Sequence, residues 1–168
     1  ESRLGYRLYV HTPDAPVILY FHGNAEIAPD YDDIATFYHG RAGASLLVVD
    51  FRGFGWSTGR PTFAALIEDA PHILNALPDV LTAGGVNPDV PRFVMGRSMG
   101  SVQAIEIAYK FPDRVKGLII ESGFADVFSL LVRLGFAAEA IGNMIDPLGN
   151  ERKMREIDLP LLVIHGEQ

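Results

Sequence analysis

The sequence contains no cysteine among its 168 residues. This absence excludes disulfide bonds, thiolate metal sites and a cysteine nucleophile, and it fits a cytoplasmic location. Basic side chains are scarce as well: there are three lysines, no basic cluster, and a formal net charge of -7. A surface this acidic repels phosphate backbones, so we expect no nucleic-acid partner. Every apolar run is far shorter than the roughly 20 residues of a membrane-spanning helix, so we expect no spanning segment in this chain.

The composition is that of a globular protein, with 48% hydrophobic and 21% charged residues. A chain of this length is sufficient for one domain with a sizeable core, so we expect residues 1–168 to form a single domain. Gln168 follows closely on the apolar run Leu161–Ile164, and domains rarely stop so soon after a buried strand. Glu1 begins the chain without a leader pattern. We therefore expect the domain to be incomplete at its C-terminus and also at its N-terminus.

Short apolar runs without polar alternation predict strands that are buried on both faces of a parallel sheet. Tyr6–Val10 is a further strand, expected at an edge of the sheet. The five predicted buried strands are Val17–Phe21, Leu46–Phe51, Phe93–Met95, Leu118–Ile120 and Leu161–Ile164.

Helical patterns occupy the stretches between these runs. Such strand–helix alternation predicts an α/β fold, with a mostly parallel central sheet, helices on both of its faces and right-handed crossovers. The predicted helices are a first one starting at Pro29 and ending at Gly40 or Gly43, a second over Phe63–Leu77 that is kinked at Pro71 and ended by Pro78, a third over Ser98–Phe111, and a fourth that begins near Asp126.

The chemistry-bearing motif is the run Gly96-Arg97-Ser98-Met99-Gly100, which reads G-x-S-x-G. A predicted strand precedes it and a predicted helix follows it, which is the context that gives this motif meaning. A sharp strand-to-helix turn strains the serine backbone, and the small neighbours Gly96 and Gly100 allow the turn without clashes. Ser98 would then lie at the carboxyl edge of the sheet, above a positive helix N-terminus. The alternative is an ordinary glycine-rich turn with a capping serine.

Two other strand ends carry recognisable loops. The first is His22-Gly23-Asn24, directly after the run Val17–Phe21, and we interpret His22 as a core residue that holds this loop rather than as a catalytic base. The second is Asp50–Gly59, which superficially resembles a dinucleotide-binding loop. Its glycine spacing is one residue too long, Pro61 follows at once, and no acidic strand end comes about 20 residues later. A nucleotide site is therefore not expected.

Together these motifs resemble the α/β-hydrolase superfamily of serine hydrolases, in order and in spacing. The strand-end His165-Gly166-Glu167-Gln168 is similar to the family's H-G-x-x-D motif, and the closest resemblance is to the small abhydrolase-domain branch. The resemblance implies that Ser98 is the nucleophile and that the backbone N–H groups of Asn24 and Met99 form the oxyanion hole. It also implies a small-molecule acyl substrate and no cofactor.

The resemblance places the catalytic acid directly after Gln168 and the catalytic histidine further on, together with a last strand and helix. None of the five histidines, at positions 11, 22, 39, 72 and 165, occupies the position of the family's base. Glu121 follows the strand beside that of Ser98, and it is either a triad acid or a carboxylate satisfied by loop backbone or by Arg97. No H-x-x-x-H spacing points to a metal-dependent hydrolase.

Residues 124–148 are predicted to form a small helical cap. Phe124, Phe128 and an apolar stripe would line its underside as an acyl pocket, although such a stripe is also typical of core packing. The stripe consists of Val127, Leu130, Leu131 and Leu134. The leading interpretation is thus a serine hydrolase that cleaves an ester, thioester or amide, and the alternative is a non-catalytic α/β-hydrolase-like binding module. With an edge strand missing, we expect self-association through the open sheet edge.

Overall fold

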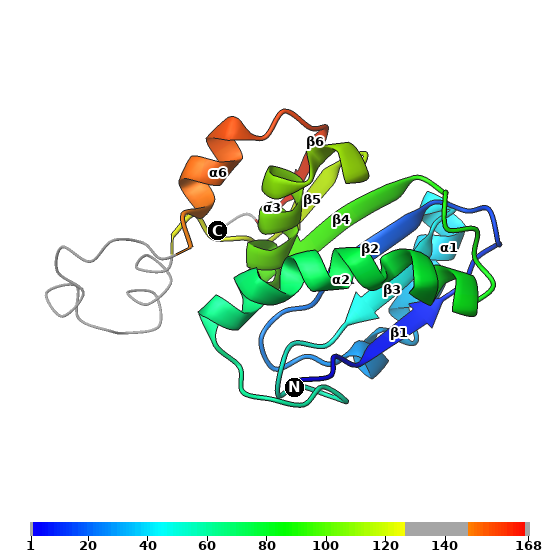
Figure 1. Cartoon of the computed structure of the whole chain (residues 1–168). Coiled ribbons are helices and arrows are strands. Elements are labelled where there is room, and N and C mark those ends of the chain that lie inside the picture. Colours follow the sequence, from blue (N-terminus) through cyan, green and yellow to red (C-terminus); the bar gives the residue numbers. More distant parts are fainter. Residues whose placement is uncertain (1, 127–147, 167–168) are drawn as a thin grey trace, which may run out of the picture.

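The computed structural model describes residues 2–126 and 148–166. Its centre is a six-stranded sheet of mostly parallel strands (Figure 1). The strands are β1 (Tyr6–Tyr9), β2 (Val17–Phe21), β3 (Ser45–Val49), β4 (Arg92–Arg97), β5 (Leu118–Glu121) and β6 (Leu161–Ile164). The predicted strands are confirmed: Val17–Phe21 and Leu161–Ile164 have the predicted bounds, and the ends of the others differ by at most two residues.

The strand order is β1-β3-β2-β4-β5-β6. Only β1 is antiparallel to its neighbour, so the prediction that this strand lies at an edge is confirmed. β4 lies between β2 and β5, and its register pairs Gly96 with Phe21 and Arg97 with Glu121. This register brings the carboxyl ends of three parallel strands together, which is where ligands bind in open α/β sheets.

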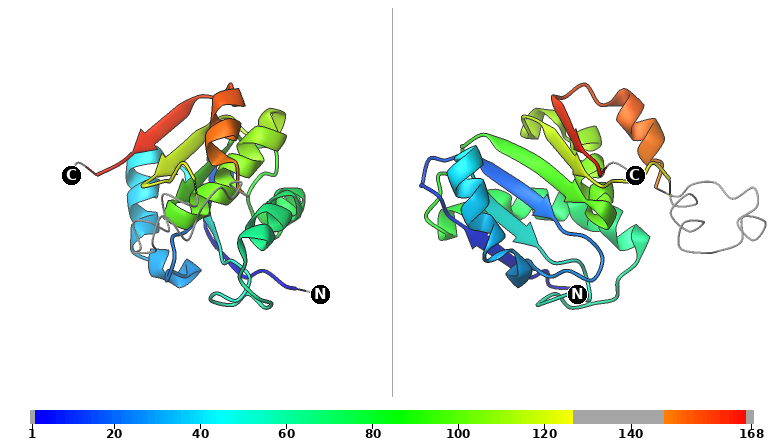
Figure 2. Two further views of the ribbon diagram at one scale, coloured as in Figure 1. Left: turned by 90° about the vertical axis from the view of Figure 1, so that its left-hand side faces the viewer. Right: turned by 180° about the vertical axis from the view of Figure 1, so that it is seen from behind.

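Helices cover the two faces of the sheet, which confirms the predicted α/β architecture (Figures 1 and 2). On one face, α2 and α3 pack over a large apolar core built around β2 and β4. On the other face, α1 and η1 cover a smaller aromatic cluster that includes Tyr20 and Tyr31. The helices are η1 (Ala28–Tyr31), α1 (Ile34–Ala42), α2 (Phe63–Ala83), η2 (Ser98–Gly100), α3 (Ser101–Lys110), η3 (Pro112–Arg114) and α6 (Asn150–Glu156).

Helix α2 continues beyond Pro78, so the expectation that Pro78 ends this helix is wrong. Proline has no N–H, and Pro78 therefore leaves the carbonyl of Leu74 without its helical donor. The guanidinium of Arg114, from η3, donates to that carbonyl from Nη2 at 2.8 Å and to the Asn75 side chain from Nη1 at 2.6 Å. A side chain 40 positions later in the chain thus replaces the missing helical bond.

Strand β6 differs from the other parallel strands in its exposure. It pairs with β5, but its four residues are each 46% to 56% exposed, so the expectation that this run is buried on both faces is wrong. The physical reason is its place at the end of the sheet: within residues 2–126 and 148–166, α6 packs on α3 and not over β6.

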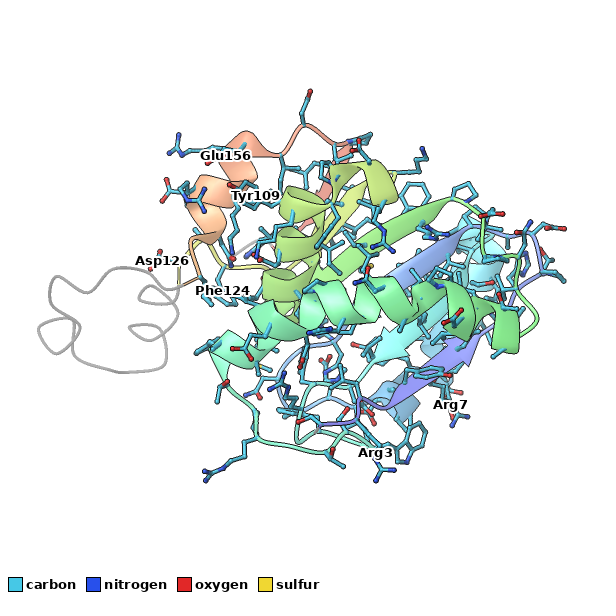
Figure 3. The ribbon with its side chains drawn as sticks, in the orientation of Figure 1. Arg3, Arg7, Tyr109, Phe124, Asp126 and Glu156 are labelled. Atoms are coloured by element: carbon cyan, nitrogen blue, oxygen red, sulfur yellow. The ribbon has the colours of Figure 1, made fainter. Side chains whose placement is uncertain are left out.

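Helix α6 was not expected from the sequence, and it is fixed to α3 by polar contacts. The Tyr109 hydroxyl donates to Glu156 at 3.1 Å, and Figure 3 shows these two residues side by side. The buried carboxylate of Glu106 lies between the ammonium groups of Lys110, at 2.5 Å, and Lys153, at 2.6 Å. The helix predicted to begin near Asp126, and with it Phe128 and the stripe of Val127, Leu130, Leu131 and Leu134, lies outside the described residues. Phe124 is half-buried against the core of α2 and α3.

Candidate active site

Ser98 lies at the turn between β4 and η2, in the strained conformation that its motif predicts. Its φ is 47°, in the left-handed region that non-glycine residues rarely adopt. The turn is tightly packed, because a side-chain carbon at Gly100 would overlap the Phe21 carbonyl and one at Gly96 would overlap the Gly100 carbonyl. Only glycine fits at these two positions, and the half-buried serine is therefore held at the carboxyl edge of the sheet.

The loop after β2 lies against this turn. His22 is completely buried, with Nδ1 at 2.8 Å from the Gly23 carbonyl and Nε2 at 3.4 Å from the Asp50 carboxylate. Its ring also packs on Phe51 and Phe54. These contacts fit the interpretation of His22 as a core residue that holds the loop.

The segment Asp50–Gly59 folds back on the buried carboxylate of Asp50. This carboxylate accepts hydrogen bonds from the backbone of Ala28 at 2.8 Å and of Trp56 at 3.1 Å. The segment therefore ties the end of β3 to η1, which is a structural role distinct from cradling a phosphate.

Asn24 and Met99 line one cavity of about 270 Å³. The other lining residues are mostly apolar and come from the segment after β3 and from the start of α2: Phe51, Phe54, Pro61, Thr62, Phe63 and Leu66. The sequence prediction places the acyl pocket within residues 124–148 and does not include these side chains. The sequence feature that could have indicated this cavity is the recurrence of phenylalanine after β3, at Phe51 and Phe54, and at the start of α2, at Phe63.

A charged cluster lies beside Ser98, on the face of the sheet that α1 covers. The Arg97 guanidinium is 2.8 Å from Glu26 and 3.5 Å from Glu121, and Glu121 also lies 3.5 Å from the Tyr20 hydroxyl. Burial alone would lower the pKa of Arg97, but Glu26, Tyr31 and Glu121 raise it above its usual value. Glu121 thus has the contacts of a carboxylate satisfied by Arg97.

The same carboxylates affect the tyrosines around them. Burial, followed by the charge of Glu121, raises the pKa of Tyr38 to about 12. Burial, followed by its hydrogen bond with Tyr31, also raises the pKa of Tyr20. These phenols therefore stay protonated at neutral pH and act in the cluster as hydrogen-bonding groups.

Apart from the buried His22, the histidines lie away from Ser98 in the described part of the chain. His11 and His39 stack on each other with their ring centroids 5.3 Å apart, next to β1. His72 is exposed on α2, and His165 is exposed after β6. β5 lies between β4 and β6, so two strand spacings, roughly 10 Å, separate the strand of Ser98 from the strand that His165 follows.

Two features are absent from the part of the chain that the structure describes, a metal-ligand cluster and a membrane-spanning helix. Within residues 2–126 and 148–166, no three histidine, aspartate or glutamate side chains come together as metal ligands would. None of the helices in that same part of the chain combines the length and the apolar character required to cross a bilayer.

Comparison with known proteins identifies relatives across most of the chain. A sequence model of the family described as serine aminopeptidase, S33, matches residues 12–146. The protein bem46 of Schizosaccharomyces pombe is 27% identical over 156 residues, covering 91% of this chain and 51% of that protein. The lysophosphatidylserine lipase ABHD12 of Rattus norvegicus is 28% identical over 170 residues, covering 90% of this chain and 41% of that protein. The chain thus spans about half the length of these relatives, or less.

Solved structures share the fold at low sequence identity. Est1E from Butyrivibrio proteoclasticus, solved with ferulic acid, gives a TM-score of 0.65 at 19% identity, covering 97% of this chain and 74% of that one. A monoacylglycerol lipase from Paleococcus ferrophilus gives 0.64 at 17% identity, covering 98% and 77%. The predicted fold is confirmed by these similarities.

Proposed function

Since the chain belongs to the serine aminopeptidase S33 family of the α/β-hydrolase superfamily, we propose that it is a serine hydrolase whose nucleophile is Ser98. Ser98 Oγ attacks the carbonyl carbon of an ester, thioester or amide, the leaving group departs with a proton, and water then hydrolyses the acyl-enzyme. The observation that carries this proposal is the strained backbone of Ser98, at a turn where only glycine fits at positions 96 and 100. The similarity to proteins named as lipases favours an ester.

The backbone N–H groups of Asn24 and Met99 stabilise the oxyanion. In support, both residues line one cavity, and no backbone hydrogen bond between described residues engages either N–H. Each donor of this kind typically lowers the barrier by about 3–4 kcal/mol.

The cavity of about 270 Å³ beside these two residues receives the acyl group. At about 30 Å³ for each methylene, which is about the size of a water molecule, it has room for roughly nine methylenes. That is enough for a medium-length acyl chain or for an aromatic acyl group. Phe54→Ala enlarges this cavity, so we expect rates on p-nitrophenyl esters to shift toward longer chains. The control is Phe37→Ala, because Phe37 is an exposed aromatic residue on α1 that does not line this cavity. An unchanged chain-length profile in Phe54→Ala would remove the cavity from the site.

Apart from the buried His22, no histidine among residues 2–126 and 148–166 lies beside Ser98, so these residues do not supply the general base of the proposed reaction. A neutral serine hydroxyl is a poor nucleophile and needs such a base. Loss of the histidine in another serine hydrolase lowers turnover by about 10⁶. We therefore expect residues 1–168 alone to hydrolyse p-nitrophenyl esters far more slowly than the full-length protein. Comparable rates would mean that the base lies within these residues.

The decisive experiment uses a second serine as its matched control. Ser122 follows β5 at the same sheet edge and also has a positive φ, of 49°. Glycine accepts this conformation, so Ser98→Gly and Ser122→Gly each remove a hydroxyl without adding backbone strain. We expect a fluorophosphonate to modify the full-length protein and its Ser122→Gly variant equally, and Ser98→Gly not at all. Labelling that survives in Ser98→Gly would assign the chemistry elsewhere, and an unreactive wild type would favour a non-catalytic binding module.

A further inference from the structure

The two loops that carry Asn24 and Met99 are both strained. Ala25 follows Asn24 with a φ of 64°, and Ser98 precedes Met99 with a φ of 47°. Such backbone conformations cost about 1–3 kcal/mol each and persist only where the surroundings hold them. Glycine packing against Phe21 holds the turn at Ser98. The loop at Ala25 needs a different support, because Asn24 and Ala25 themselves are exposed.

Glu26 provides that support through both oxygens of its carboxylate. Oε2 accepts hydrogen bonds from the backbone N–H of Gly23 and from the hydroxyl of Tyr31, each at 2.7 Å. Oε1 lies 2.8 Å from Nη1 of Arg97. One side chain therefore closes the loop of residues 23–26 on itself, joins it to η1 and connects it to β4.

Arg97 is the residue directly before Ser98, and its guanidinium lies between two carboxylates. The second is Glu121 on β5, at 3.5 Å from Nε. Two carboxylates facing one guanidinium leave no net positive charge for an anionic ligand. Since Arg97 is 41% exposed, an isolated ion pair here would add little to global stability. The ion pair is distinguished by its position, because Glu26 lies two residues after Asn24 and Arg97 lies two residues before Met99.

We propose that the Glu26–Arg97 ion pair positions the oxyanion hole by fixing the loop of Asn24 relative to the turn of Ser98 and Met99. This inference rests on the proposed function. Glu26 and Arg97 are positioning residues, which act through the two backbone N–H groups and do not touch the reacting atoms. Because the oxyanion forms only during the reaction, a misplaced donor lowers kcat and leaves KM nearly unchanged.

The test uses Glu26→Gln and Arg97→Gln in the full-length protein, with Arg7→Gln as control. Arg7 forms an ion pair of similar exposure with Asp32, and two strands, β3 and β2, separate its strand β1 from β4. A displacement of about 1 Å at a reacting group costs up to about 100-fold, so we expect kcat on p-nitrophenyl butyrate to fall roughly 10- to 100-fold in each variant. KM should stay within about twofold, and Arg7→Gln should behave as wild type.

A second readout is independent of catalysis. Arg97→Gln changes neither the donor nor the acceptor of the hydrogen bond from Gly23 to Glu26. We expect amide hydrogen exchange at Gly23 to be about tenfold faster in this variant, which would show that Arg97 holds the carboxylate. Unchanged exchange together with unchanged kcat would overturn the inference. A KM that rises in Arg97→Gln for anionic esters alone would also overturn it, because Arg97 would then be a substrate-binding residue. A wild type that a fluorophosphonate does not modify refutes the proposed function, while the exchange at Gly23 still decides on the ion pair.

Discussion

The carboxyl ends of β4 and β6 show two extremes of packing within one sheet. The turn after β4 is so close to the end of β2 that a methyl group at Gly100 would overlap backbone atoms. After β6 the packing is open, because a methyl group at Gly166 would have no neighbour within 4 Å among the described residues. Strand interiors follow the same division, since Leu19 is 1% exposed and Leu162 is 53% exposed. The tight region is the one that carries the candidate site, which needs its groups held in fixed positions.

The largest effect that this comparison predicts is at the two glycines. Gly100→Ala should destabilise the protein by about 4 kcal/mol, above the usual range for overpacking, because the obstructing atoms belong to the backbone and cannot rotate away. Gly166→Ala should change the free energy of unfolding by less than about 0.5 kcal/mol. Urea denaturation of both variants measures the difference. Similar values would show that the turn after β4 relaxes easily.

The next effect concerns two leucines at the middle of parallel strands. Leu19→Ala leaves a cavity in the core between β2 and the helices α2 and α3, and should cost about 3 kcal/mol. Leu162→Ala removes a side chain that is half in water, so its cost should stay below about 1 kcal/mol. Equal costs, measured by thermal and urea unfolding, would mean that β6 is buried in solution.

The third prediction concerns how tightly α6 is attached to the packed part of the molecule. Lys153→Met leaves the buried Glu106 with one cationic partner instead of two, and should cost about 2 kcal/mol at pH 7. Burial raises the pKa of Glu106, but Lys110 and Lys153 lower it by a larger amount, so the pKa lies below its ordinary value. The stabilisation is therefore complete above the ordinary carboxyl pKa of about 4.3 and is lost as the pH falls through the lowered value. Glu106→Gln should flatten this acid limb in urea titrations at pH 3 to 7. A steep limb in that variant would assign the acid sensitivity to other carboxylates.

The smallest effect on stability is expected on β6 itself. Val163→Lys should alter the free energy of unfolding by less than about 0.5 kcal/mol, because this side chain is 56% exposed. We expect the 168-residue chain to self-associate through this apolar edge and the lysine to weaken that association. Light scattering over a concentration series gives the mass. A wild-type chain that stays monomeric throughout would contradict the expectation.

The sequence was sufficient for the sheet because its strands appear as apolar runs, and local patterns of that kind survive in the fold. Ser98 could be singled out for a similar reason, because Gly96 and Gly100 form a local motif with it, although the atoms that exclude a side chain at Gly100 belong to Phe21 and His22 at the end of β2. The resemblance, rather than any spacing, supplied Asn24 and Met99, and the roles of all three residues stay predictions.

The remaining features depend on contacts between distant segments, which a local pattern does not contain. Nothing near Pro78 indicates that Arg114 replaces the missing donor of α2. The run Leu161–Ile164 has the composition of a buried strand, and its exposure follows from its place in the sheet. Likewise, the cavity beside Asn24 forms only where the segment after β3 meets the start of α2.

The last turns of α2 rely on a residue that the ribosome adds much later. Proline inside a helix costs about 3 kcal/mol, so the segment after Pro78 gains little from being helical until the guanidinium of Arg114 reaches Leu74. At about 5–20 residues per second, the 40 residues between them take roughly 2 to 8 s to synthesise. During that interval β4 and α3 are still being made. The nascent chain therefore gains the contact that stabilises the end of α2 only after the strand and helix on either side of Ser98 have been synthesised.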